Sequence, residues 1–305
     1  LPFVWFTNQP TNAGQMQNMV EFETSELPAN FAFNPNYKET LTQNPDMLAI
    51  MTLNRNQNRF DIYMANPRSA ICKLIVRDEA PQYIKESAYE NMVFYKEHFA
   101  LMSERDGYNH IYWYTLGGNL VKQVTQGNYE VTSFIGWDET TNTFYYESNE
   151  GSPLRNATYK IDAKGRKTEL TKEHGSNSSI FSTNFRYFMN TYSNLNTPPV
   201  YTLNDNNGKV LVTLLDNEPL KEKLSKLDMP QRELFQFTTS NGTQLNGWMV
   251  KPSHFDPSKK YPVIMYQYSG PGSQMVKDSW NVGGKGEGCI WEAYLAQEGF
   301  ISVCV

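Results

Sequence analysis

The sequence predicts a mainly β protein, in which a partial β-propeller of about four blades precedes the first strands of a parallel α/β sheet. Three observations predict it: a repeat with a period in the forties, an aromatic content of 14%, and an apolar strand, helix and strand near the C-terminus. At 305 residues the chain is long enough for two domains. We assign residues 1–229 to the propeller portion and residues 230–305 to the second domain.

Four segments share a polar turn, a tyrosine-bearing strand, a second turn and a second strand. Their aligned tyrosines, which lie 49, 47 and 42 residues apart, are Tyr63, Tyr112, Tyr159 and Tyr201. The turns after these strands are Asn66-Pro67, Gly117-Gly118, Lys164-Gly165 and Asn207-Gly208. Further strand-like runs at 92–95, 99–102, 133–137 and 143–146 bring each unit to about four strands, as in a propeller blade. Strand candidates within residues 1–45 are interrupted by Asn, Gln and Pro.

The sequence changes character after residue 214. A charged stretch from 218 to 228 is compatible with a helix, and two strands then flank an Asn241-Gly242 turn. The run 261–268 is nearly continuous in apolar residues, which is typical of a strand buried on both faces. A helix at about 291–297 and a strand at 300–305 complete a pattern that favours a parallel α/β sheet.

Composition excludes several classes of protein. The net charge of −5 is unlike the basic footprint of a nucleic-acid binder, and no apolar run approaches the ~20 residues of a membrane-spanning helix. Cys72, Cys289 and Cys304 form no Cys-x-x-Cys pair, so we interpret them as small buried hydrophobes. The glycine-rich stretch 283–288 lacks the spacing of a phosphate loop, and neither a metal nor a cofactor is expected.

One string carries a resemblance to a known family. Residues 259–274 read Lys-Lys-Tyr-Pro-Val-Ile-Met-Tyr-Gln-Tyr-Ser-Gly-Pro-Gly-Ser-Gln, and this resembles the opening strand and loop of the catalytic domain in the dipeptidyl peptidase IV family of serine peptidases. The segments 247–249, 252–256, 104–112 and 128–131 resemble the same family. The resemblance covers most of residues 46–305 and implies that residues 230–305 begin an α/β-hydrolase domain.

The resemblance implies a catalytic role for Tyr268. The matching tyrosine of the family contributes its hydroxyl to the oxyanion hole, where it meets the negative charge that develops on the scissile carbonyl oxygen. A single donor of this kind contributes ~3 to 4 kcal/mol to transition-state stabilisation. From the residues alone, a core tyrosine at a strand end is the favoured interpretation, and the resemblance reverses that preference.

Other parts of such an enzyme have no match in this sequence. No Gly-x-Ser-x-Gly occurs, and each histidine precedes the expected nucleophile, so we interpret His98, His110, His174 and His254 as structural or surface residues. The family's paired glutamates, which bind the substrate's amino terminus, also lack a match, since Glu21 and Glu23 are separated by Phe22. We expect that segment to lie upstream of Leu1, the serine and histidine to lie beyond Val305, and this chain alone to be inactive.

We therefore expect part of a secreted or periplasmic serine exopeptidase that releases Xaa-Pro or Xaa-Ala dipeptides from peptides through an acyl-enzyme. The expected partner is a peptide substrate, and a homodimer is left open. One alternative is an oligopeptidase or acylaminoacyl peptidase of the same architecture. A second alternative is a non-catalytic propeller that binds a peptide or glycan. Three sequons, at Asn156, Asn177 and Asn241, would mark exposed loops if glycosylated, although chance explains them equally well.

Overall fold

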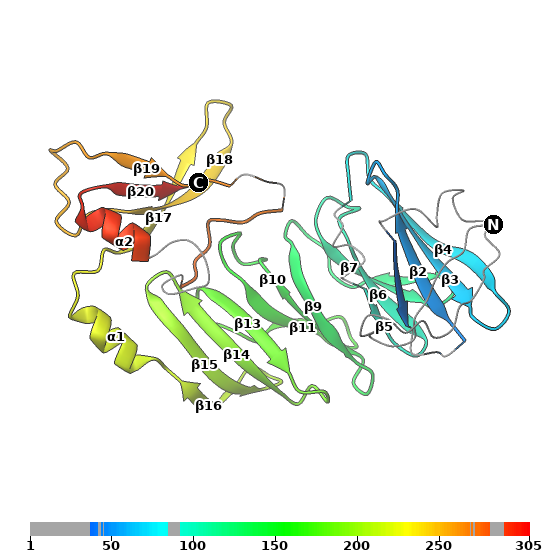
Figure 1. The fold of residues 1–305 in the computed structure, drawn as a ribbon. Helices are drawn as coiled ribbons and strands as arrows, with labels where there is room; N and C mark the ends of the chain where they lie inside the picture. The colour runs from blue at the N-terminus through cyan, green and yellow to red at the C-terminus, as the bar shows by residue number, and fades with distance from the viewer. Residues whose placement is uncertain are drawn as a thin grey trace, which may run out of the picture. The chain divides into compact units, whose positions relative to one another are not determined.

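The structure is a computed structural model that describes residues 37–41, 44, 46–84, 92–268, 270, 272–280 and 290–305. The chain divides into two compact units, Leu1–Phe134 and Ile135–Val305. The described residues are mainly β, as predicted, and most of the strands belong to four-stranded sheets built from strands consecutive in sequence (Figure 1).

The described part of the first unit contains two complete four-stranded sheets and the start of β9 (Val131–Asp138). The first sheet has the order β1-β2-β3-β4 and the second β5-β6-β7-β8, with antiparallel pairing throughout. Buried side chains from both sheets, including Met51, Ile62, Phe99 and Leu101, form one apolar core. The strands are β1 (Tyr37–Leu41), β2 (Leu48–Leu53), β3 (Arg59–Asn66), β4 (Ile71–Glu79), β5 (Val93–Phe94), β6 (His98–Ser103), β7 (His110–Thr115) and β8 (Leu120–Gln123).

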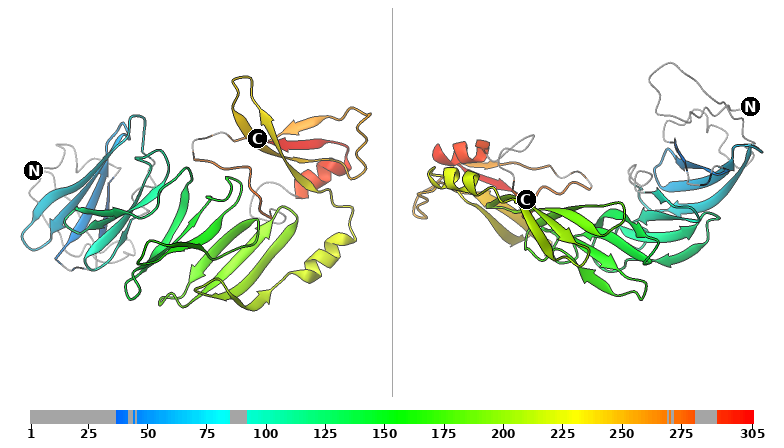
Figure 2. Two further views of the ribbon diagram at one scale, coloured as in Figure 1. Left: turned by 180° about the vertical axis from the view of Figure 1, so that it is seen from behind. Right: turned by 90° about the horizontal axis from the view of Figure 1, so that it is seen from below.

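Two more such sheets lie side by side (Figure 2), and all of their residues except the first four of β9 belong to the second unit. Their orders are β9-β10-β11-β12 and β13-β14-β15-β16, and a parallel bridge between Asn156 and Ser176 connects them. The strands are β9 (Val131–Asp138), β10 (Thr143–Ser148), β11 (Ala157–Ile161), β12 (Lys167–Glu169), β13 (Ser176–Phe181), β14 (Tyr187–Asn194), β15 (Thr197–Asp205) and β16 (Val210–Leu215). Sheets of four sequential strands are the arrangement of propeller blades.

The four aligned tyrosines occupy equivalent places. Tyr63, Tyr112, Tyr159 and Tyr201 each lie in the third strand of their sheet, on β3, β7, β11 and β15. The first three are buried, and burial raises the pKa of Tyr63 to about 12. The repeat predicted from the sequence is therefore confirmed as a structural repeat.

Two of the predicted turns make the same contact between neighbouring sheets. Gly118, between β7 and β8, and Gly208, between β15 and β16, both have positive φ angles. A Cβ atom at Gly118 would lie 2.3 Å from the carbonyl oxygen of Ile75 in the preceding sheet, and one at Gly208 would lie 2.2 Å from that of Leu170. Each hairpin thus approaches the previous sheet so closely that only glycine fits.

A fifth sheet of different character follows. Its order is β17-β18-β20-β19, formed by β17 (Arg232–Thr238), β18 (Gln244–Val250), β19 (Val263–Met265) and β20 (Ile301–Cys304). Helix α1 (Glu218–Ser225) precedes the sheet, and α2 (Ile290–Gln297) lies between β19 and β20 in sequence. β19 and β20 are parallel, as the strand, helix and strand pattern predicts, whereas β18 and β20 are antiparallel.

The expectation that the strand within 261–268 is buried on both faces is wrong. All three residues of β19 are exposed, and because successive side chains of a strand point to opposite faces, neither face of β19 is buried against other described residues. Cys72 and Cys304 are buried, as expected, and burial raises the pKa of Cys304. Cys289, the stretch 283–288, Glu21 and Glu23 lie outside the described residues. Neither described helix has the length and hydropathy needed to cross a membrane.

Candidate functional site

Tyr268 follows β19 at the edge of the mixed sheet. The strand is held by its parallel pairing with β20 and by a hydrogen bond from the backbone N–H of Tyr266 to the carbonyl oxygen of Val303, at 2.9 Å. Tyr268 is 64% exposed. An exposed phenol after a strand is accessible to a ligand, and its O–H can donate a hydrogen bond to an oxyanion.

The loop after Tyr268 packs against the tyrosine ring. A Cβ atom on Gly270 would lie 2.8 Å from Cε1 of Tyr268 and 3.0 Å from its hydroxyl oxygen, so Gly270 and the ring are in close contact. The N–H of Ser273 donates to the carbonyl oxygen of Gly270 at 3.0 Å, and Gly272 has a φ angle of 75°. A tight turn therefore lies beside the tyrosine.

Farther along this segment, Asp278 connects it to the third and fourth sheets. Its carboxylate accepts hydrogen bonds from Nε of Arg155 at 2.9 Å and from the N–H of Leu195 at 3.1 Å. Its backbone N–H donates to the carbonyl oxygen of Leu154 at 2.8 Å, and its carbonyl oxygen accepts from the hydroxyl of Ser176 at 3.0 Å. Asp278 is buried, and neither it nor Arg155 carries a motif or periodicity that would have singled it out in the sequence.

The four histidines occupy structural or surface positions, in line with their interpretation from the sequence. His110 is fully buried, with Nε2 bonded to the carbonyl oxygen of Gly127 and Nδ1 to the hydroxyl of Thr125. His98 stacks on Trp113. His174 is exposed, and His254 is 95% exposed at 3.8 Å from the carboxylate of Asp228.

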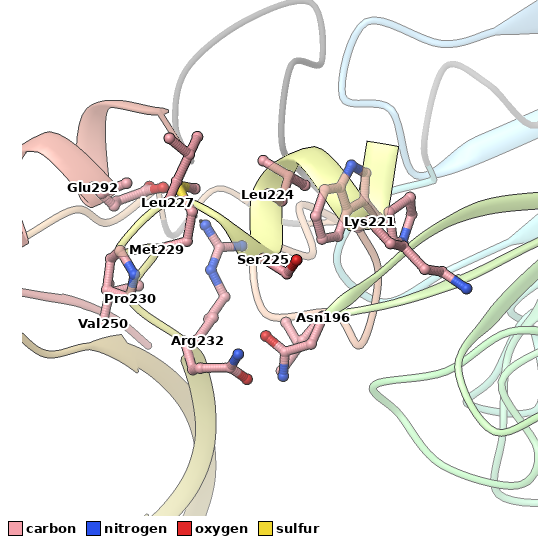
Figure 3. A pocket seen from close by; sticks show the side chains of 15 residues that line it. Asn196, Lys221, Leu224, Ser225, Leu227, Met229, Pro230, Arg232, Val250 and Glu292 are labelled. Carbon is pink, nitrogen blue, oxygen red and sulfur yellow. Dashed lines mark hydrogen bonds and ion pairs between the residues drawn. The ribbon is translucent and has the colours of Figure 1, made fainter. Parts of the chain in front are cut away.

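A cavity of about 420 Å³ lies elsewhere in the second unit, lined by the β14–β15 turn, α1, the segment after α1, and α2 (Figure 3). Nη2 of Arg232 donates to Oε2 of Glu292 at 2.9 Å, and the guanidinium lies 4.1 Å from the centre of the Trp248 ring. Burial raises the pKa of Glu292, although Arg232 opposes that shift. Tyr268 is not among the lining residues, so this cavity is separate from the predicted oxyanion donor.

Potential metal ligands and sequons are two further features of the described residues. Among the described residues, no group of three His, Cys, Asp or Glu side chains is placed to hold a metal ion. The Asn156 amide donates to Glu147, and Asn177 is buried with its amide donating to the carbonyl oxygens of Asn156 and Glu173. Asn241 is exposed in the β17–β18 turn, so it alone of the three sequons lies on an exposed loop.

Comparisons with known proteins agree on one family. The family model described as the dipeptidyl peptidase IV N-terminal region matches residues 11–199. Dipeptidyl peptidase 4 of Trichophyton rubrum is 30% identical over 250 residues, which are 79% of this chain and 32% of that protein. Dipeptidyl peptidase 4 of Arthroderma otae is 28% identical over 249 residues, which are 79% of this chain and 32% of that protein. The crystal structure of Porphyromonas gingivalis dipeptidyl peptidase 4 matches with a TM-score of 0.82 and 42% identity, over 88% of this chain and 37% of that one.

Proposed function

Because this chain belongs to the family of the dipeptidyl peptidase IV N-terminal region, we propose that it is part of a serine exopeptidase that releases N-terminal dipeptides. The chain spans about a third of the length of the curated relatives it matches. The nucleophilic serine and the triad histidine are assigned to sequence outside these 305 residues, and the chain supplies the propeller portion and one donor. We propose that the enzyme is secreted or periplasmic and that its substrates are peptides.

The parallel pair β19 and β20, with α2 between them in sequence, supports the start of an α/β-hydrolase domain at residue 230. In this proposal the four-stranded sheets before residue 229 belong to the propeller, which limits access to the catalytic centre. The boundary between residues 229 and 230 follows the change in sheet type and stays a prediction.

The observation that carries the proposed mechanism is the exposed position of Tyr268, three residues after the end of β19. In acyl transfer, a serine oxygen attacks the carbonyl carbon of the second residue, and the carbonyl oxygen gains negative charge. The phenolic O–H of Tyr268 would donate a hydrogen bond to that oxygen in the tetrahedral intermediate. The triad histidine takes the serine proton and gives it to the nitrogen of the remaining peptide, so collapse of the intermediate expels a neutral amine and leaves the dipeptide as an acyl-enzyme. Water then hydrolyses the acyl-enzyme and releases the dipeptide.

Tyr268→Phe in the complete gene product tests this role. Removing one oxyanion donor should lower kcat for a Gly-Pro anilide by about 10²- to 10³-fold with a smaller change in KM. Tyr294→Phe, which removes an exposed tyrosine hydroxyl on α2, is the matched control and should leave kcat unchanged. Wild-type turnover by the Tyr268→Phe enzyme would refute the assignment.

Two further measurements test the substrate class. We expect hydrolysis of the free Gly-Pro anilide and no hydrolysis of its N-acetylated form, whereas an acylaminoacyl peptidase would prefer the blocked substrate. The isolated 305-residue chain should hydrolyse neither, because it lacks a Gly-x-Ser-x-Gly elbow. Turnover by the isolated chain would contradict the proposal that the nucleophile lies elsewhere.

A further inference from the structure

We propose that the Arg155–Asp278 ion pair is a positioning pair for the oxyanion donor, holding the segment after Tyr268 against the third and fourth sheets. This inference rests on the proposed function of Tyr268. According to this proposal, the third and fourth sheets help to position the Tyr268 hydroxyl.

The contacts of Asp278 make it the main attachment point of this segment. Both of its carboxylate oxygens and both of its backbone polar groups bond to residues that belong to or flank β11, β13 and the β14–β15 turn. The side chain is 9% exposed and that of Arg155 is 41% exposed. Removing the guanidinium would leave a nearly buried carboxylate without its cation, which is a costly arrangement.

Neighbouring residues of the same segment reinforce the attachment. Nε2 of Gln274 donates to the carbonyl oxygens of Val276 at 2.8 Å and Pro153 at 3.4 Å. The N–H of Trp280 donates to the hydroxyl of Ser193 at 3.2 Å. Val276 is buried with Trp248 of β18, and Leu154 packs against this cluster. The segment therefore joins the mixed sheet to the third and fourth sheets by both polar and apolar contacts.

The attachment reaches Tyr268 through the tight turn. Gly270 lies against the tyrosine ring, and its carbonyl oxygen is bonded to the N–H of Ser273, one residue before Gln274. Because Tyr268 is largely exposed, the position of its ring depends on the segment that packs against it. A shift of about 1 Å in a catalytic donor can lower a rate by 10²-fold.

Arg155→Ala and Asp278→Asn in the complete gene product test the pair. We expect kcat for a Gly-Pro anilide to fall about tenfold to a hundredfold, with KM changed less than about twofold. Arg155→Lys should recover part of kcat because it retains the cation. Ser176→Ala, which removes one hydrogen bond to Asp278, is a milder variant that should lower kcat in the same direction even if the ion-pair variants fold poorly.

Arg77→Ala is the matched control. Nε of Arg77 bonds to Oδ1 of Asp61 at 2.7 Å, and the two side chains are 42% and 2% exposed, so the exposures match those of Arg155 and Asp278, although Asp61 also has Arg59 at 3.4 Å. It lies in the first unit, on β4 and β3. We expect Arg77→Ala to leave kcat unchanged, and a loss equal to that of Arg155→Ala would overturn the proposal by showing a general effect of instability.

Combining each variant with Tyr268→Phe separates this inference from the proposed function. If Arg155 acts by placing the Tyr268 hydroxyl, Arg155→Ala should not lower kcat further once that hydroxyl is absent. Multiplicative losses in the double variant would overturn the positioning role, as would wild-type kcat in Arg155→Ala and Ser176→Ala. Tyr268→Phe with wild-type kcat would instead refute the role of the tyrosine itself.

Discussion

At the scale of single residues, Gly270 determines where the Tyr268 ring can lie. A methyl group at this position would overlap the ring, so we predict that Gly270→Ala displaces the phenol and lowers kcat of the complete gene product about tenfold or more. The measurement is kcat and KM for a Gly-Pro anilide, together with the melting temperature. Gly117→Ala is the control, because its Cβ would have its nearest contact at 3.8 Å. An active Gly270→Ala enzyme would show that the tyrosine tolerates displacement.

The sequence could identify single functional residues only where a motif marked them. Tyr268 could be singled out because it stands in a specific loop string, and its exposure leaves the proposed role open to test. Asp278 and Arg155 could not, because they are 123 positions apart and their pairing is made by folding. A polar residue in an irregular loop gives no periodic signal, so the sequence alone could not distinguish this buried aspartate from a solvated one.

At the scale of elements, a polar cluster connects the first two sheets. The carboxylate of Asp78, at the end of β4, accepts a hydrogen bond from Ser103 of β6 and one from Arg105 at 3.2 Å. The Arg105 guanidinium also donates to the Tyr114 hydroxyl at 2.6 Å and lies 4.3 Å from the centre of the Tyr112 ring. One arginine thus joins the end of β4 to both β6 and β7.

We predict that Asp78→Ala lowers the opening free energy of β6 and β7 by about 2 kcal/mol, because it leaves the Arg105 side chain, which is 25% exposed, without the carboxylate of Asp78. Hydrogen exchange of the β6 and β7 amides measures this. Arg68→Ala breaks an exposed pair with Asp46 in the same unit and should change these amides by less than about 0.5 kcal/mol. Equal protection in wild type and Asp78→Ala would contradict the connecting role.

Elements rich in aromatic and β-branched residues were the predictable ones. The runs at 92–95, 99–102, 133–137 and 143–146 are confirmed as β5, β6, β9 and β10, and both helices lie where the sequence placed them. β13 gave no such signal, because it buries Asn177 and Ser179 in place of apolar side chains. Hydrogen bonds across strands satisfy these groups, and such partners are not visible in an apolar pattern.

At the scale of the whole molecule, the change in sheet type and the division into compact units fall at different places. The sheets change from sequential strands to a mixed sheet between β16 and β17, whereas the compact units meet at residues 134 and 135. The second unit includes the mixed sheet because the 272–280 segment bonds to the third and fourth sheets. Sequence patterns report the type of secondary structure, and these long-range bonds are invisible to them.

Buried carboxylates give the molecule a pH dependence of stability. Glu147 of β10 accepts hydrogen bonds from the N–H of Ser179 at 2.6 Å and from the Asn156 amide at 3.1 Å. Burial raises the pKa of Glu147 above its usual 4.5, and these hydrogen bonds offset only part of that shift. The native state therefore keeps a proton that the unfolded state has lost, so this group's contribution to the free energy of unfolding falls as pH rises above 4.5.

Glu147→Gln removes this titration and adds a cost that does not depend on pH, because an amide nitrogen replaces one acceptor oxygen facing Asn156 or Ser179. We predict that the melting temperature of the variant, relative to wild type, rises as the pH increases from about 4.5 to about 7. Glu292→Gln should show a trend of the same sign, since burial also raises the pKa of Glu292. If this difference in melting temperature stays constant or falls across the pH range, the pKa of Glu147 is not raised in the folded protein.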